Sequence, residues 1–221
     1  DACAKAGDLA RAELWHEKMA DNGVQPNAHS FSAVINACAK AGDLAAASRY
    51  LIRMEEADVP ADVVVYSSVL DACAKVGDTE RGKQVFQQMR SRGIRPNVIS
   101  YASLARPLAH RGDWQEVECL MNEMLGEGLA MNEYFLYVVL LAYASARPRR
   151  GDRAEAAFRE ACQSGVEINK HVLTVLWRAV GRARSNELVS ELCGGRGRGM
   201  GSVRGGGGRR QPNGAARAAP A

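Results

Sequence analysis

The stretch Asp71–Asp78, with the sequence DACAKVGD, decides the fold because near copies of it recur along the chain. Residues 36–43 are NACAKAGD, residues 1–8 are DACAKAGD, and residues 106–113 form a weaker copy, RPLAHRGD. Glycines and methionines in or after these copies lie 35 residues apart: Gly7, Gly42, Gly77 and Gly112, and Met19, Met54, Met89 and Met124. A fixed period of this length predicts a solenoid of repeated supersecondary units.

Each unit has the pattern of two helices joined by a glycine turn. The first half of residues 28–62 carries apolar side chains at helical spacing, namely Phe31, Val34, Ile35 and Cys38. Gly42 fits the left-handed residue that ends a helix, and Asp43 fits the N-cap of the next helix. The second helix has its own apolar face: Leu44, Ala47, Tyr50, Leu51 and Met54. The sequence therefore predicts an all-α superhelical solenoid of stacked antiparallel helix-turn-helix repeats.

The period also divides the chain into segments. We expect a partial unit at 1–27, full units at 28–62 and 63–97, a degenerate unit at 98–132, an irregular unit at 133–169, a terminal helix pair at 170–193, and a disordered Gly/Arg-rich tail at 194–221. Pro107 should kink the first helix of the degenerate unit. Because Asp1 falls inside a unit, we expect a longer protein with further repeats, and any targeting peptide, before it.

Composition restricts the function only weakly. The net charge is +4, but the tail holds six arginines and no acid, so residues 1–193 sum to −2. No apolar run approaches the ~18 residues of a membrane span. The six cysteines show neither a CxxC pair nor zinc-ligand spacing, and we expect small buried hydrophobic residues in a reducing compartment.

Several motifs together point to one family. A 35-residue helical hairpin with Tyr or Phe near its start, Cys-Ala-Lys-x-Gly-Asp at its middle, a late Met and Gly-Ile-x-Pro-Asn/Asp at its end resembles the pentatricopeptide repeat. The similarity covers residues 1 to about 193 and is strong to 132; the tetratricopeptide repeat has a different period and pattern. The resemblance implies a right-handed superhelix that binds single-stranded RNA, as an adaptor in organellar RNA processing, stability, editing or translation, in the mitochondrion or chloroplast.

The resemblance also implies which residues contact RNA. In this family the fifth and last residues of each repeat recognise one base. The pairs are Ser32 with Asp62 for guanine, Ser67 with Asn97 for adenine, and Ala102 with Asn132 for weak discrimination, since alanine cannot hydrogen-bond. A further pair, Tyr137 with Asn169, falls outside the code.

Two more sets follow from the resemblance. The second residue of each repeat brackets the base: His29, Val64, Ile99 and Tyr134. A lysine late in the first helix approaches phosphate: Lys5, Lys40 and Lys75, with His110 in the degenerate unit. Ordinary packing between repeats and a solvated charge at a helix C-terminus are the plain alternatives for these two sets.

Nothing in the sequence predicts catalysis, a cofactor, a metal site, a small-molecule substrate or a membrane partner. The segment 77–84 looks like a phosphate-binding loop but lacks the final Ser or Thr and a preceding strand. The expected partners are single-stranded RNA and other RNA-processing proteins. The alternative is a helical scaffold that binds protein partners without recognising RNA, which the −2 charge of residues 1–193 favours. The tail could bind single-stranded nucleic acid or serve as a flexible end.

Overall fold

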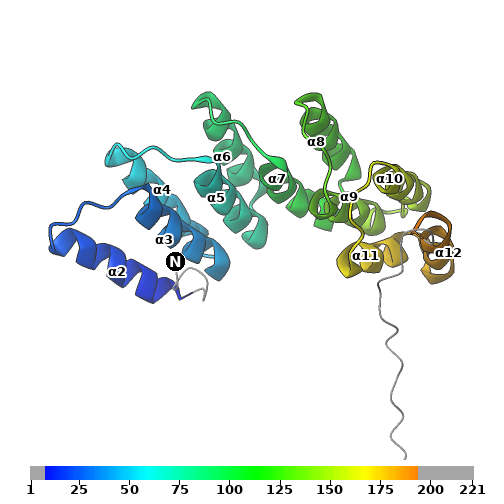
Figure 1. Cartoon of the computed structure of the whole chain (residues 1–221), viewed down its shortest axis with the longest axis horizontal. Helices are drawn as coiled ribbons and strands as arrows, with labels where there is room; N and C mark the ends of the chain where they lie inside the picture. The colour runs from blue at the N-terminus through cyan, green and yellow to red at the C-terminus, as the bar shows by residue number, and fades with distance from the viewer. Residues whose placement is uncertain (1–7, 194–221) are drawn as a thin grey trace, which may run out of the picture.

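The computed structural model describes residues 8–193, and within this range every regular element is a helix (Figure 1). The helices are α2 (Leu9–Asp21), α3 (Ala28–Ala41), α4 (Leu44–Glu56), α5 (Val63–Val76), α6 (Thr79–Ser91), α7 (Val98–Arg111), α8 (Trp114–Gly126), α9 (Glu133–Ser145), α10 (Gly151–Gln163), α11 (Lys170–Val180) and α12 (Arg182–Cys193). Lys5, Cys3 and the Gly/Arg-rich tail lie outside the described residues.

The turn chemistry expected from the sequence is present. Gly42 ends α3 with a φ of 74°, in the left-handed region that favours glycine. The Asp43 carboxylate then accepts a 2.8 Å hydrogen bond from the Ala46 backbone N–H and caps α4. Gly77 ends α5 and Asp78 caps α6 in the same way. Each hairpin is therefore specified by interactions within about four residues.

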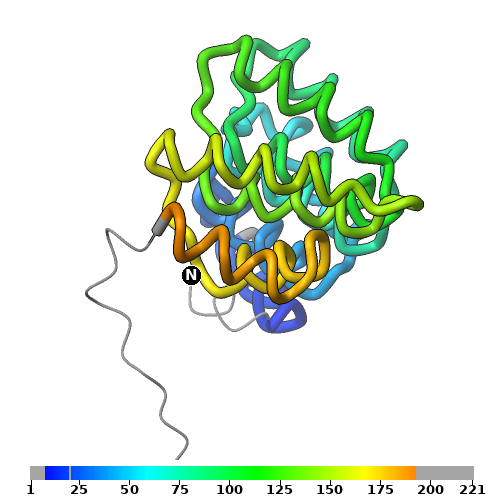
Figure 2. The backbone as a smooth tube through the Cα atoms, turned by 90° about the vertical axis from the view of Figure 1, so that its right-hand side faces the viewer, coloured from blue at the N-terminus to red at the C-terminus, as the bar shows by residue number. Residues whose placement is uncertain are grey.

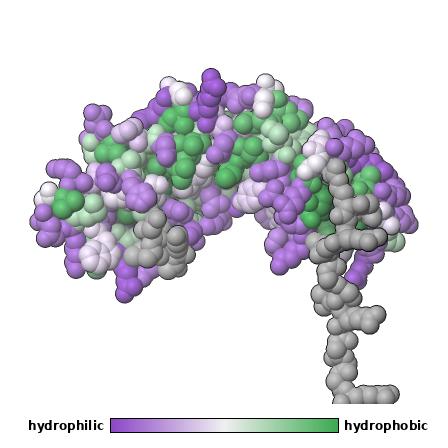
Figure 3. All heavy atoms as spheres, viewed as in Figure 1, coloured by the Kyte–Doolittle hydropathy of each residue, from purple (hydrophilic) through white to green (hydrophobic). Residues whose placement is uncertain are grey.

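The hairpins stack into an arch, as the sequence predicted. The first helices, α3, α5, α7, α9 and α11, pack against one another in a row on the inner, concave side, and the second helices, α4, α6, α8 and α10, lie on the outer side (Figure 1). Viewed along the row, successive hairpins lie one behind another (Figure 2). The space-filling view shows the hollow beneath the arch (Figure 3).

Unequal packing of the two rows accounts for the curvature. Each inner helix touches the next one, and small buried residues such as Ala102, Ala105 and Ala109 let the backbones of this row come close. From α4 to α10, no outer helix contacts the next outer helix along the backbone. The inner row is therefore short and tightly packed, and the outer row is splayed.

Ion pairs bridge the splayed outer helices. Arg92 of α6's C-cap reaches Glu55 of α4 at 2.9 Å, Lys83 of α6 reaches Glu116 of α8 at 3.5 Å, and Arg153 of α10 reaches Glu118 of α8 at 2.7 Å. Exposed pairs of this kind contribute about 0–1 kcal/mol each. Apolar packing of the core, to which both rows contribute side chains, therefore supplies most of the stability, and the ion pairs link neighbouring outer helices.

α7 runs unbroken from Val98 to Arg111 with the buried Pro107 inside it, and the kink at Pro107 stays a prediction.

The cysteines meet the sequence expectation only in part. Cys38 and Cys73 are free and buried, as expected, and burial raises the pKa of their thiols to about 12 and about 11. Cys119 is exposed, so the prediction of a buried cysteine is wrong there. No described helix has the length and apolar character that crossing a membrane requires.

His16 of α2 is a buried polar side chain that lowers the stability of the packing of α2 against α3 and α4. Its ring is buried in T-shaped contacts with Phe31 and Tyr50, at centroid distances of 4.7 and 5.3 Å, and neither ring nitrogen has a hydrogen-bond partner. Burial lowers the pKa of His16 below 6.5, Arg53 lowers it further, and Glu17 opposes the change. Residues 35 and 70 positions later, Leu51 and Phe86, are buried hydrophobic residues.

We expect His16→Leu to raise the free energy of unfolding by about 1 kcal/mol at neutral pH, because it removes unpartnered buried nitrogens. Since the folded pKa is the lower one, the wild type loses stability as pH falls through 6.5 towards that folded pKa, because the unfolded chain binds the proton more readily. Urea denaturation between pH 8 and pH 5 measures both effects. If the variant's free energy of unfolding fell with pH as steeply as that of the wild type, the pH dependence could not come from His16.

Candidate nucleic-acid interface

The last residue of each repeat is the N-cap of the following inner helix. The side-chain oxygens of these residues accept backbone N–H groups of the first turn, and all are at the same end of successive inner helices: Asn27, Asp62, Asn97, Asn132 and Asn169. An asparagine cap uses its carbonyl oxygen and keeps its two amide N–H donors, whereas an aspartate cap has acceptors only. The cap residues therefore occupy equivalent positions in successive repeats but differ in the hydrogen-bond donors and acceptors that they leave free.

The fifth residues are less accessible than the sequence suggests. Ser32 and Tyr137 are half-buried, Ser67 is 8% exposed, and the Ala102 side chain is fully buried. The pair Ser67 and Asn97 is joined through a third residue, Ser100. The Ser67 and Ser100 hydroxyl oxygens are 2.9 Å apart, and the Ser100 hydroxyl donates to Asn97 Oδ1 at 3.1 Å.

Ser100 is the residue that sequence reasoning missed at this position. It completes a capping box with Asn97, and the spacing Asn-x-x-Ser, also present at Asn27 and Ser30, is the local signal for it. Asp62 has no such partner, because Val65 occupies the third position after it. The two predicted base-recognising pairs thus differ in their hydrogen bonds as well as in the chemistry of the cap residue.

The second residues form an exposed row on the inner helices. Val64 and Ile99 are 52% and 51% exposed, Tyr134 is 39% exposed, and His29 is also exposed. Their neighbours in the same helices are mostly buried against adjacent inner helices or the outer row. Because the remaining open side of an inner helix faces the hollow, these four side chains line the concave face. We call them the inner ladder.

A chain of polar contacts crosses the same helices. Lys75 Nζ donates to the Ala39 carbonyl oxygen at 2.7 Å and pairs with Asp71 at 3.1 Å. Asp71 also pairs with Arg106 at 3.1 Å, and the Arg106 guanidinium lies 5.3 Å from the centroid of the Tyr134 ring. A phosphate contact by Lys75 therefore has to compete with two existing partners.

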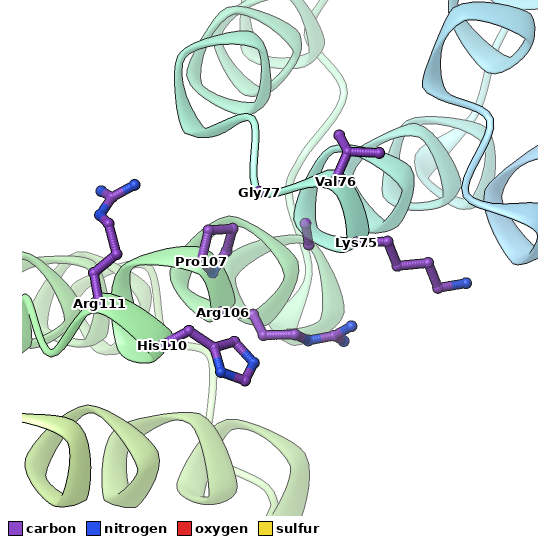
Figure 4. A pocket seen from close by; sticks show the side chains of 8 residues that line it. Lys75, Val76, Gly77, Arg106, Pro107, His110 and Arg111 are labelled. Atoms are coloured by element: carbon purple, nitrogen blue, oxygen red, sulfur yellow. The ribbon is translucent and has the colours of Figure 1, made fainter.

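Basic side chains surround a groove at the C-terminal ends of α5 and α7. Lys75, Arg106, His110 and Arg111 line an open space of about 490 Å³ (Figure 4). Arg106 and Arg111 were not among the predicted phosphate residues. The sequence signal for Arg106 is charge complementarity. Asp71, of opposite charge, occupies the same repeat position one unit earlier. Lys40 is exposed at the end of α3, whereas the predicted Lys5 lies outside the described residues.

Two further ionisable groups with a shifted pKa, Tyr143 of α9 and Glu155 of α10, contact neighbouring helices. Burial and a hydrogen bond to Glu118 raise the pKa of Tyr143. Hydrogen bonds from Arg184 and Arg159 lower the pKa of Glu155 to about 2. These groups link neighbouring helices. In residues 8–193, His, Cys, Asp and Glu side chains do not gather in a group able to hold a metal ion.

Comparison with known proteins agrees with this architecture. The family model described as the pentacotripeptide-repeat region of PRORP matches residues 1–154. The chain belongs to the pentatricopeptide-repeat family. No curated protein matches it.

Solved pentatricopeptide-repeat structures share the fold of this chain. The repeat protein PPR10 in complex with an 18-nucleotide psaJ RNA element has a TM-score of 0.70 at 17% identity, over 86% of this chain and 28% of that one. The PPR domain of Arabidopsis thaliana protein-only RNase P 1, in complex with tRNA, gives 0.65 at 16%, over 85% and 94%. Nuclear proteinaceous RNase P 2 of A. thaliana gives 0.62 at 16%, over 79% and 39%. The chain therefore spans less than half of two of these relatives.

Proposed function

We propose that the concave face binds single-stranded RNA with one base per repeat, and that the protein is an adaptor in RNA processing, stability, editing or translation in a mitochondrion or chloroplast. The observation that carries the proposal is the inner ladder, an exposed row of large side chains repeated on successive inner helices. Two similar proteins of known structure, PPR10 and the PPR domain of RNase P 1, are bound to RNA. No catalytic role is part of the proposal.

The inner ladder and the N-caps have complementary roles in this proposal. A base inserted between consecutive members of the ladder stacks on apolar surface, which contributes about 1–3 kcal/mol per base and tolerates any sequence. The cap residue at the same repeat boundary then meets the Watson–Crick edge. An Asp62 carboxylate can accept the N1–H of guanine, whereas an Asn97 amide N–H can donate to N1 of adenine.

The degenerate repeat should bind a base without selecting it. Ala102 has no polar atom and is fully buried, so only Asn132 faces the base. With two selective pairs, at about 1–3 kcal/mol for a well-recognised base, residues 28–132 cannot select a unique transcript.

The sharpest test exchanges the two cap residues. We expect Asn97→Asp to change the preference of its repeat from adenine to guanine by several-fold, and Asp62→Asn to make the reverse change. Both residues already act as N-caps in this chain, so each variant should keep its helix start. Equilibrium binding to short single strands that differ at one base measures the change.

The wild type should also prefer a GA-containing strand over a pyrimidine-only strand, and binding should weaken with salt. An unchanged base preference in both variants would sink base recognition by the caps. Absence of RNA binding would favour the alternative function, a helical scaffold that binds protein partners. The existing partners of Lys75 and the −2 charge of residues 1–193 are the observations that support this alternative.

A further inference from the structure

Positive charge is concentrated on the turns of the C-terminal half. The α3–α4 and α5–α6 turns each hold one lysine and one aspartate, at residues 40–43 and 75–78. The α9–α10 turn instead holds three arginines against Asp152, and the last turn of α11 with the first residue of α12 holds two arginines and no acid. We call these five residues the turn patch: Arg147, Arg149, Arg150, Arg178 and Arg182.

Backbone contacts make the turns one continuous edge. A Cβ on Gly151 would lie 3.3 Å from the Ala179 carbonyl oxygen, which places the α9–α10 turn directly against the end of α11. A Cβ on Gly112 would lie 2.7 Å from the Ser145 carbonyl oxygen, so the α7–α8 turn touches the end of α9 in the same way. The turn patch therefore adjoins the basic groove of α5 and α7 along one side of the arch.

The arginines of the patch are available to an anion. Arg147, Arg149 and Arg178 are exposed, and no carboxylate within residues 8–193 forms an ion pair with them. Arg150 lies 5.0 Å from the Trp114 ring centroid, and its buried Nε has no acceptor. Arg182 lies 5.4 Å from the Trp177 ring centroid.

We propose that the turn patch binds the phosphate backbone of a base-paired RNA stem adjoining the single strand on the concave face. The proposal extends the proposed function and rests on it. Guanidinium groups form paired hydrogen bonds to phosphate, whereas contacts to phosphate position an RNA without recognising its sequence.

A stem fits this surface better than more single strand. Single strands bind through rings free to stack on bases. Here the Trp114 ring is contacted by two guanidinium groups, that of Arg150 and, at 4.4 Å, that of Arg153. A stem has its bases turned inward and presents phosphates, which is what a row of arginines can bind.

The test compares two triple variants of equal charge. The first is Arg147→Ala with Arg149→Ala and Arg178→Ala. The control is Lys18→Ala with Arg95→Ala and Lys170→Ala, which removes three exposed cations from the opposite ends of the helices. The probes are a GA-containing single strand, the same strand extended by a hairpin at its 5′ or its 3′ end, and the hairpin alone.

We expect the wild type to bind one hairpin-extended RNA more tightly than the bare strand. The patch variant should lose this gain, and the slope of log affinity against log salt should fall by about 2 to 3, as for three lost phosphate contacts. Its affinity for the bare strand should change less, and the control should keep the hairpin gain.

Three results would overturn the proposal: a hairpin that adds no affinity, an equal loss in both variants, or patch-dependent binding to phosphatidylserine vesicles without a hairpin gain. Failure of the proposed function looks different. In that case the bare strand does not bind while the hairpin alone still binds in a patch-dependent way.

Discussion

Gly112→Ala is expected to lower the free energy of unfolding by about 2–5 kcal/mol, more than the same change at Gly77. Both glycines are left-handed, with φ of 82° and 76°, so alanine costs about 1–2 kcal/mol at either position. At Gly77 an added Cβ meets nothing within 4 Å. At Gly112 it would lie 2.7 Å from the Ser145 carbonyl oxygen and 2.9 Å from the Ala146 nitrogen, and backbone cannot move aside cheaply.

Urea denaturation of the two variants in parallel separates the cost of backbone strain from the cost of the steric clash with the end of α9. The difference between them isolates the contact between the α7–α8 turn and the end of α9, since the backbone strain is shared. Equal losses at Gly77 and Gly112 would show that the two hairpins are not in contact there. Because that contact also connects the basic groove to the turn patch, its loss should weaken the RNA-stem gain as well.

Tyr134→Ala is expected to weaken binding of single-stranded RNA by about 1–3 kcal/mol, roughly 5- to 150-fold, with little loss of stability. The ring is 39% exposed, so its removal leaves no cavity in the core. Arg106 lies against the ring and would lose this contact, but it keeps its ion pair with Asp71. Fluorescence anisotropy with a labelled strand measures the affinity, and a thermal melt checks the fold.

Two controls make this test specific. Tyr134→Phe keeps the ring and should bind nearly as the wild type does. Ile99→Ala and Ile52→Ala remove the same atoms from residues that are 51% and 48% exposed, the first on the concave face and the second on the outer helix α4. Only the Ile99 variant should lose affinity. Equal effects of the two isoleucines would refute the inner ladder as the RNA-binding surface.

Local features of the fold could be predicted because their causes are local. The 35-residue period, the helix ends at Gly42 and Gly77, and the cap at Asp43 depend on neighbours within one helical turn. The all-α solenoid followed from these signals and the period alone. The candidate RNA residues instead came from family resemblance, and their roles remain predictions.

Accessibility could not be predicted, because it depends on how neighbouring repeats stack. Serines at the same repeat position, Ser32 and Ser67, differ in burial, and only Ser67 is tied to Ser100 of the next inner helix. Lys75 looked free to contact phosphate, yet it is held by Asp71 and by a carbonyl of the preceding inner helix. The i,i+4 pairing with Asp71 lies within α5 and has a local signal, but the Ala39 carbonyl and Ser100 lie on other helices, so no local pattern predicts those contacts.

The sequence by itself determined the repeat, the hairpin, and the residues that begin and end each helix, since hydrogen bonds and apolar faces within one unit fix them. Only the tertiary structure decided which side chains the concave face exposes, that Arg106 joins Asp71 to Tyr134, and that the arginine-rich turns form one edge. The physical reason is that stacking brings together residues about 35 positions apart, and their contacts depend on the close approach of whole helices.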